Sequence, residues 1–530
     1  MGEKRTKGRT LFMARGTNET EATARHARGA KAPRRTPKSE KPHKQNFIAR
    51  AINGWCNRLL GAVTEGDFAD QPAEYASHRT TRDYLCNSIG TGAWGMVFPV
   101  LTVVVTQLVG VELAGMFSLA FVTGSLLMIL ANYGVRTFQI SDLAEAHSFS
   151  DYQVNRWITC AVMLVVGWIY CSIRGYAGEM FVISMGVYVY KMVDGLADVY
   201  EGRLQQKDKL YLAGISQAFL SVVVLVVFSV SLFVTRSVGA SCIAMAVAAC
   251  ATFVVLTLPL AIWETPKSER ATTQSVVALF KQCAPLFIAL FLYSLIDNMP
   301  KFVMDGVLSY DNQLYYNALY FPAMGILLTA QLIYKPMLVK MAAVWADPDK
   351  RKRFDLIIVV MIAVIVGITA VVALVMGWIG ITVMSFLYGV DFEQFRGLCF
   401  IMLAAGGVTA CIDFLYQVVT VLRQQKTVTK LYLITFGFSL FVPTLLVNFT
   451  GLPGSVIGYL IVMMILLVLL VWEYGKVRIA LGERDKKAAA AEAERVVAHA
   501  VSDSTLGFDP APASRPSRDR GGSNGGGRRR

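Results

Sequence analysis

The sequence predicts an all-α polytopic membrane protein with twelve transmembrane helices, arranged as two pseudo-symmetric six-helix bundles. Three observations support this fold class. The 530 residues are 55% apolar and only 17% charged, whereas a soluble domain has about 25% charged residues. Apolar runs of about 20 residues recur along the chain, and each is long enough to cross a bilayer. A short polar segment with a preceding buried acid also recurs, which indicates an internal repeat.

Twelve apolar runs are candidate spans. They cover residues 84–108, 112–133, 157–173, 178–200, 210–234, 238–263, 277–299, 314–333, 356–378, 397–422, 431–449 and 454–472. Two connections are unusual. Residues 136–152 are polar with spaced apolar side chains and are expected to lie along the inner surface. Residues 379–396 are interpreted as an outward interfacial turn or short helix, and not as a span.

Loop charges set the orientation of these spans. Every second connection carries at least two Lys or Arg residues, whereas the alternate connections carry at most one. By the positive-inside rule the basic connections and both termini are cytoplasmic, so we expect a multi-pass protein of the cell membrane. The predicted organisation is a basic, mostly disordered tail (1–81), two six-helix bundles (82–263 and 277–474) joined by a cytoplasmic linker (264–276), and a tail that is helical and then disordered (475–530).

The net charge of +14 is concentrated in the tails. Residues 1–50 hold 14 basic and 4 acidic side chains, and residues 501–530 hold 6 and 3, so the tails account for 10 + 3 of the surplus. Blocks of like charge are usually solvated and disordered. Anionic lipid headgroups are the expected contact of these tails. Nucleic acid is not an expected partner, because the tail has few aromatics and no recognisable module.

The internal repeat relates the fourth and tenth spans. The fourth span is followed by Leu-Gln-Gln-Lys at 204–207, and the tenth span by Arg-Gln-Gln-Lys at 423–426. The same offset places Asp194 on Asp413. The sequence therefore predicts that one half repeats the other, with an acid buried at the same place in each.

Lys191, Asp194 and Asp198 lie inside an apolar run at positions i, i+3 and i+7, so they share one helix face. A charge in hydrocarbon costs roughly 3 kcal/mol on insertion scales. Two interpretations follow. The three residues form an ion pair that satisfies itself at a helix interface, or they line a cavity that binds protons, ions or substrate.

Five further residues are candidates for the same cavity or for substrate contact. Asp413 has no basic neighbour one turn away and needs a partner from another helix. Asp297 and Lys301, at i and i+4 near the outer end of the seventh span, form an interfacial pair or a cavity pair. Arg136 and Lys335 lie near the inner ends of the second and eighth spans. They anchor to lipid headgroups or contact the phosphates of an anionic substrate.

No pattern predicts an enzyme. The sequence has no nucleotide-binding glycine loop and no H-E-x-x-H, none of its five His lies within a candidate span, and its nine Cys are scattered without a C-x-x-C pair. We expect no catalytic residues, no metal site and no cofactor. Transport would be driven by an H+ or Na+ gradient or by substrate flow.

Three segments carry a resemblance to a known family. NYGVRTFQISD (132–142), GRLQQKDKLYLAG (202–214) and LYGVDF (387–392), with two sets of six spans, resemble the polysaccharide-transporter branch of the MOP flippase superfamily. The resemblance covers about residues 84–472 and not the tails. It implies a V-shaped pair of bundles that flips undecaprenyl-diphosphate-linked oligosaccharide to the outer leaflet for surface polysaccharide export. Polysaccharide polymerase and glycosyltransferases are the partners that it implies, and family members keep charged residues in a central cavity.

Three alternatives stay open. A cation-coupled drug antiporter of the related MATE branch would favour acids over bases in its cavity. A major-facilitator carrier also has two sets of six spans, but residues 134–142 do not fit the basic loop that this family has after its second span. A membrane-embedded glycosyltransferase would need a sizeable outward loop with catalytic acids, and the predicted outward loops are short.

Overall fold

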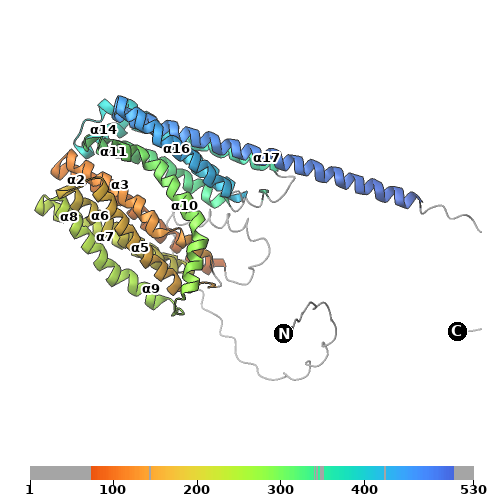
Figure 1. Cartoon of the computed structure of the whole chain (residues 1–530), viewed down its shortest axis with the longest axis horizontal. Helices are drawn as coiled ribbons and strands as arrows, with labels where there is room; N and C mark the ends of the chain where they lie inside the picture. Colours follow the sequence, from red (N-terminus) through yellow and green to blue (C-terminus); the bar gives the residue numbers. More distant parts are fainter. Residues whose placement is uncertain are drawn as a thin grey trace, which may run out of the picture. The chain divides into compact units, whose positions relative to one another are not determined.

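The computed structural model describes residues 73–142, 145–338, 341, 344–345, 351–422 and 425–505. These residues belong to one compact unit, Leu59–Arg530, and are almost entirely helical (Figure 1). Twelve of the helical segments are long and apolar enough to cross a membrane, which confirms the predicted fold class and number of spans. Most of the basic tail predicted for residues 1–81, and the last part of the C-terminal tail, lie outside the described residues.

Two sets of helices follow one another along the chain. The first half consists of α2 (Ala73–Val109), α3 (Val111–Asn132), α4 (Val135–Ser141), α5 (Phe149–Ile173), α6 (Gly178–Gln206), α7 (Leu210–Thr235), α8 (Val238–Thr252), the π-helix η1 (Phe253–Thr257) and α9 (Leu258–Glu264). The second half consists of α10 (Thr273–Met304), α11 (Asp311–Tyr334), the 3-10 turn η2 (Lys335–Met337), α13 (Arg351–Val375), the π-helix η4 (Met376–Gly380), α14 (Ile381–Tyr388), the 3-10 turn η5 (Glu393–Phe395), α15 (Arg396–Val421), α16 (Gln425–Thr450) and α17 (Leu452–Thr505).

The order of packing repeats between the halves. In the first half α2 packs on α7, α6 on α8, and both α3 and α5 on α6. In the second half α10 packs on α16, α15 on α17, and both α11 and α13 on α15. Thus α6 and α15, the helices that carry Asp194 and Asp413, occupy the same central place in their halves. Each is covered by neighbours from its own half; Asp194 is buried and Asp413 is partly buried.

The ninth span is longer than predicted. It runs from Arg353 to Tyr388, through a π-helical turn and into α14, and the chain reverses only at Gly389. The interpretation of residues 379–396 as an interfacial turn or short helix, and not as a span, is therefore wrong for the part before Gly389, which continues the span although α14 is itself a short helix. The physical reason is that this stretch is apolar up to the reversal, where Gly389 has a φ of +66°, a backbone conformation that glycine adopts without strain.

The segment 136–152, which is expected along the inner surface, is partly buried against the first half. Its first part forms α4, which packs on α6, and the buried Gln139 donates Nε2 to the carbonyl of Val199 at 3.0 Å. The segment ends where Ser148 and Asp151 form a capping box that starts α5. Packing of α4 against α6 brings Arg136 next to the charged face of α6.

The two halves contact each other at both ends. At the ends that the loop charges assign to the inside, α10 lies against α3 and α5: Ser275 donates its hydroxyl to Asp151 at 2.8 Å, and Tyr133 packs on Phe280 and Phe287.

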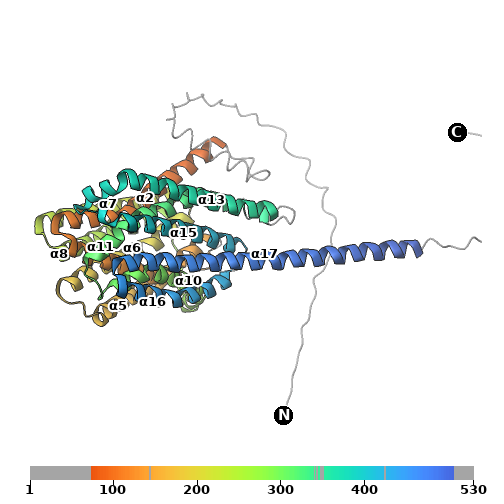
Figure 2. The ribbon, with the colours of Figure 1, turned by 90° about the horizontal axis from the view of Figure 1, so that it is seen from above.

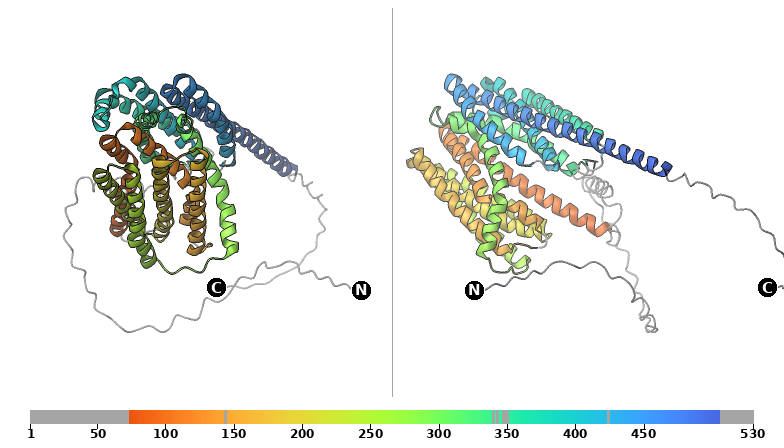
Figure 3. Two further views of the ribbon diagram at one scale, coloured as in Figure 1. Left: turned by 60° about the vertical axis from the view of Figure 1, so that its left-hand side comes forward. Right: turned by 45° about the vertical axis from the view of Figure 1, so that its right-hand side comes forward.

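The loop charges assign one end of each helix to the outside of the membrane, and these are called the predicted outer ends. At the predicted outer ends α3 packs on α11 and α2 meets α14; Gln107 of α2 donates Nε2 to the carbonyl of Leu387 at 2.8 Å. From these ends most helices of the two halves diverge, whereas α10 crosses to the opposite end of the first half (Figures 1 and 3). The last helix, α17, continues well beyond its membrane span (Figure 2).

Candidate functional site

Asp198 on α6 is held by two arginines from other helices. Its Oδ1 lies 2.6 Å from Nη1 of Arg136 on α4, and its Oδ2 lies 2.7 Å from Nη2 of Arg156 on α5. Arg156 is fully buried and also donates to the carbonyl of Ala131 and to Asn132. Asp198 is therefore not neutralised by its own helix, as the sequence spacing suggested, but by cations from two neighbouring elements.

Lys191 and Asp194, one turn earlier on α6, form a second buried pair. Lys191 Nζ lies 3.3 Å from Oδ2 of Asp194, and the Trp94 indole donates Nε1 to the same oxygen at 2.6 Å. The ammonium lies 4.5 Å from the ring centroid of Phe121 and 5.0 Å from those of Trp94 and Tyr190. Lys191 is only 3% exposed, so three aromatic faces and one carboxylate replace its hydration.

Arg136 lies between the charged face of α6 and the two cavities described below. Its Nη2 donates to Gln205 at 3.1 Å, and Glu201 lies 4.0 Å away. Burial opposes the charged form of the guanidinium, but Asp198 and Glu201 outweigh it and raise the pKa of Arg136 above its ordinary value. The side chain stays charged while 30% of its surface remains exposed.

Two cavities meet at Arg136. A cavity of about 360 Å³ within the first half is lined by residues that include Trp94, Asn132, Arg136, Asp194, Asp198 and Glu201. A cavity of about 420 Å³ is lined from both halves, by Asn132, Arg136 and Asp198 of the first and by Tyr293, Ser294 and Asp297 of the second, among others. Polar groups converging on a space between two halves are typical of a binding site.

In the second half, Asp297 and Lys301 of α10 are not joined as the predicted i, i+4 pair. Asp297 accepts hydrogen bonds from the hydroxyls of Tyr459, at 2.7 Å, and Tyr320, at 3.1 Å. Lys301, 3% exposed, donates Nζ to Asn298 at 2.9 Å and lies 4.3 Å from the ring centroid of Tyr320. The carboxylate and the ammonium thus each bond to uncharged groups.

Asp413 on α15 finds its partners on α11, as the sequence required. Gln331 donates Nε2 to Oδ2 of Asp413 at 2.9 Å, and the Tyr334 hydroxyl donates to the same oxygen. Lys335, at the predicted inner end of α11, is exposed and donates Nζ to Oε1 of Gln331 at 2.8 Å. One glutamine therefore links the exposed cation to the acid.

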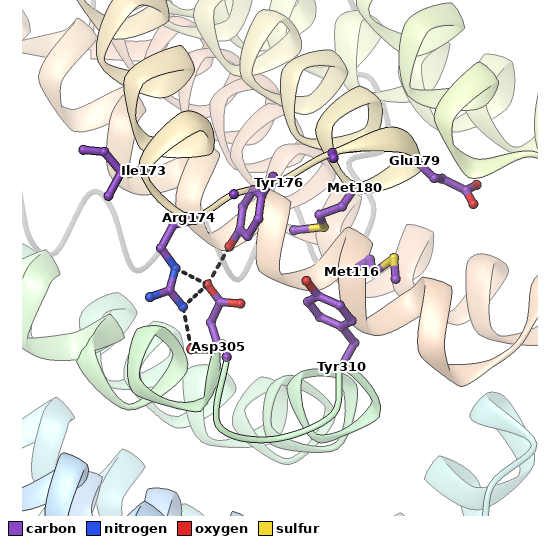
Figure 4. A pocket seen from close by; sticks show the side chains of 11 residues that line it. Met116, Ile173, Arg174, Tyr176, Glu179, Met180, Asp305 and Tyr310 are labelled. Carbon is purple, nitrogen blue, oxygen red and sulfur yellow. Dashed lines mark hydrogen bonds and ion pairs between the residues drawn. The ribbon is translucent and has the colours of Figure 1, made fainter.

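A third cavity, of about 670 Å³, lies at the predicted outer ends between the halves. Figure 4 shows Arg174 and Tyr176 of the first half pointing at Asp305 of the second half. Arg174 Nε lies 2.8 Å from Oδ2 of Asp305, and the Tyr176 hydroxyl donates to that oxygen at 2.6 Å. The cavity is also lined by Met116, Glu179, Met180 and Tyr310. This contact joins the halves at the predicted outer ends.

Sequence reasoning missed several of these residues. Arg156 and Arg174 were counted only as loop charges, although Arg156 is buried against Asp198 and Arg174 bridges the halves. The partners of the acids Asp194, Asp297 and Asp413 are aromatic or amide side chains within apolar runs, with no motif to distinguish them. Glu201, which lines the first-half cavity and lies near Arg136, could have been found from the sequence, because it is an acid one helical turn beyond Asp198 on the same helix.

Solved structures with this fold are transporters of the MOP superfamily. An inward-facing multidrug resistance MATE family transporter matches with a TM-score of 0.55 at 13% identity, covering 73% of this chain and 95% of that one. The outward-facing conformation of such a transporter matches with a TM-score of 0.50 at 14% identity, covering 76% and 96%. A mutant of the Vibrio cholerae MATE transporter VcmN also matches with a TM-score of 0.50, at 15% identity, covering 76% and 98%.

At these identities the likeness shows a shared fold. No protein-family model matches the sequence, and no curated protein does. The chain is thus a multi-pass membrane protein with a MOP-type arrangement of twelve helices, and its polar groups gather between and within the two halves.

Proposed function

We propose that this protein is a transporter that moves an anionic, phosphate-bearing lipid-linked oligosaccharide across the cytoplasmic membrane by alternating access. The substrate class is an undecaprenyl-diphosphate-linked oligosaccharide destined for the cell surface. The observation that carries this proposal is Arg136, whose charged and partly exposed guanidinium lines both central cavities.

Arg136 is suited to a diphosphate for two reasons. Asp198 and Gln205 occupy part of its donor fork, so the guanidinium is held in place while part of it stays accessible. A planar guanidinium binds phosphate oxygens with two parallel hydrogen bonds, which a compact ammonium does not do. Lys335, exposed at the inner end of the counterpart helix α11, would offer the second half's contact to the same headgroup.

Alternating access requires that the contacts at one end of the cavity break. The Arg174–Asp305 contact and the Gln107 hydrogen bond join the halves at the predicted outer ends. With both termini in the cytoplasm, this arrangement corresponds to a state closed to the outside. Transport would then release Asp305 from Arg174 and Tyr176 and close the opposite ends, as in other transporters built from related halves.

Asp297 and Asp413 are the proposed sites for coupling. Each carboxylate accepts hydrogen bonds from uncharged tyrosine or glutamine side chains, so uptake of H+ or Na+ would not have to displace a bonded cation. A gradient of either ion would reset the transporter after the substrate leaves. Polysaccharide polymerase and glycosyltransferases would act on the substrate before or after this step.

The second candidate function is a cation-coupled multidrug antiporter. It is favoured by the same two acids, and two of the matching structures above are described as multidrug resistance transporters. Ethidium efflux would support this candidate. An antiporter for organic cations would have no use for Arg136 in substrate binding, so the effect of changing Arg136 separates the two candidates.

The deciding experiment uses the full-length protein in liposomes that contain a fluorescent undecaprenyl-diphosphate-linked oligosaccharide. We expect Arg136→Ala to slow flipping at least tenfold and Arg136→Lys to slow it less. Arg396→Ala is the matched control, because Arg396 is exposed and, among the described residues, pairs with the nearby Glu393 and a main-chain carbonyl. Unchanged flipping in Arg136→Ala, or ethidium efflux without any flipping by the unaltered protein, would overturn the proposal.

A further inference from the structure

We propose that Lys191 is a built-in cation that occupies an organic-cation site formed by Phe121, Trp94, Tyr190 and Asp194, and thereby keeps organic monocations out of the central cavity. In this view Lys191 determines specificity without touching the substrate. Its side chain fills the place that a quaternary ammonium ion would take.

The chemistry around Lys191 is that of a cation receptor. Three ring centroids lie 4.5–5.0 Å from its ammonium, within the range at which aromatic faces attract cations. The Asp194 carboxylate, 3.3 Å away, supplies the countercharge. Aromatic cages that bind methylated ammonium ions combine the same elements.

The cage is next to space that a ligand could enter. Trp94 and Asp194 both line the cavity of about 360 Å³ in the first half, whereas Lys191 itself is 3% exposed. Shortening Lys191 to alanine would leave a void bordered by this cavity and a buried carboxylate without its cation. A buried uncompensated charge is costly, so the void would favour a small cation that can enter it.

The second half contains a comparison for this cage. Lys301 also lies over tyrosine rings, 4.3 Å from Tyr320 and 5.8 Å from Tyr316. Its nearby acid, Asp297, is however already bonded to the hydroxyls of Tyr320 and Tyr459. Removal of Lys301 would therefore leave a carboxylate with two donors, and we expect it to create a much weaker cation site.

The consequence for substrate choice rests on the proposed transport function. If the cavity carries an anionic headgroup, a permanent internal cation in the first half disfavours organic cations by charge and by occupancy. The same fold without this lysine would present an acid framed by aromatic rings. One residue would then separate cavities for anionic substrates from cavities for organic cations.

The test is a binding measurement with purified full-length protein and tetramethylammonium chloride, with sodium chloride as the ionic-strength control. The heat of titration and the midpoint of thermal unfolding report binding. We expect Lys191→Ala to bind tetramethylammonium at least tenfold more tightly than the unaltered protein and to gain thermal stability from it. Lys191→Ala/Asp194→Asn and Lys301→Ala should show neither effect.

Equal affinity in the unaltered protein and in Lys191→Ala would overturn the inference, as would equal affinity in Lys191→Ala/Asp194→Asn. If Lys191→Ala is poorly folded, growth and purification with tetramethylammonium should raise its yield, and failure to recover it in either condition counts against the cage. Because this measurement involves no lipid-linked substrate, its outcome is independent of the flipping assay on Arg136.

Discussion

The candidate cavity acids of the two halves, Asp194 and Asp198 in the first and Asp297 and Asp413 in the second, differ in the charge of their partners. In the first half Asp194 pairs with Lys191, and Asp198 pairs with Arg136 and Arg156. In the second half the partners are hydroxyls and an amide, from Tyr320 and Tyr459 to Asp297 and from Gln331 and Tyr334 to Asp413. The helices repeat, but the electrostatics do not.

This difference means that the acids of the first half have a fixed negative charge, whereas Asp297 and Asp413 in the second half can gain and lose a proton or a bound cation. A carboxylate between two guanidinium groups is stabilised as an anion, and protonating it would leave buried cations without a countercharge. A carboxylate bonded to neutral donors can change its charge without leaving an unpaired partner. We therefore assign the permanent field of the cavity to the first half and the coupling step to the second half.

The largest expected effect on stability is that of Asp198→Asn in the first half, compared with Asp413→Asn in the second half. Asp198→Asn leaves the fully buried Arg156 with neutral partners among the described residues, and losing one member of a buried pair costs about 3–5 kcal/mol. Asp413→Asn keeps an acceptor for Gln331 and Tyr334, and we expect it to cost about 1 kcal/mol. Unfolding of the two purified variants in detergent measures both. Equal costs would break the comparison.

The contact between the halves is expected to give the next largest effect. Arg174→Ala leaves Asp305, whose side chain is 3% exposed, with the Tyr176 hydroxyl as its remaining side-chain donor among those described, at a cost of about 2 kcal/mol. The outer ends should then open more often, so a cysteine placed at Met116 in the cavity wall should react faster with a thiol reagent.

Two variants control this measurement. Arg174→Asp/Asp305→Arg should restore the slow reaction, because the pair is rebuilt with reversed charges. Arg236→Ala should leave it unchanged, because this exposed arginine bonds to Leu108 within the same half. Fast reaction already in the unaltered protein would show that this contact does not hold the halves together.

A smaller effect is expected at Asp297. Tyr459→Phe and Tyr320→Phe each remove one hydroxyl donor, at about 1 kcal/mol per hydrogen bond. In the background of Asp297→Leu, which has no acceptor, each change should cost measurably less. A double-mutant cycle from unfolding curves gives this coupling. Costs that are equal in both backgrounds would mean that the tyrosines stabilise the fold and not the acid.

The smallest expected effect on stability is at Lys335. Its side chain is exposed and bonds only to Gln331 among the described partners, so Lys335→Gln should change stability by less than about 0.5 kcal/mol. If Lys335 contacts the substrate headgroup, the same variant should slow flipping several-fold. The buried Lys301→Gln is the comparison, since its loss should lower stability more. A Lys335→Gln protein with unaltered flipping would remove Lys335 from the proposed site.

The number of spans was accessible from the sequence because it depends on local composition. Apolar runs of bilayer length identify helices without knowledge of their neighbours, and the repeated Gln-Gln-Lys segment correctly paired α6 with α15. The boundaries of the ninth span were less accessible. Its apolar stretch continues through a π-helical turn, and only the left-handed Gly389 marks the reversal.

The partners of the charged residues depend on packing between helices. Spacing along α6 suggested that Lys191, Asp194 and Asp198 neutralise one another, and this is true only of the first two. Asp198 receives Arg156 because α5 packs on α6, and Arg136 because α4 folds back against the same helix.

The sequence by itself determined that the chain crosses a membrane about twelve times and buries several charges, because hydrophobicity and charge are properties of each residue. The tertiary structure decided which cation faces each acid, which rings surround Lys191 and where the two halves touch. Those contacts join residues up to 280 positions apart, and no local spacing encodes them.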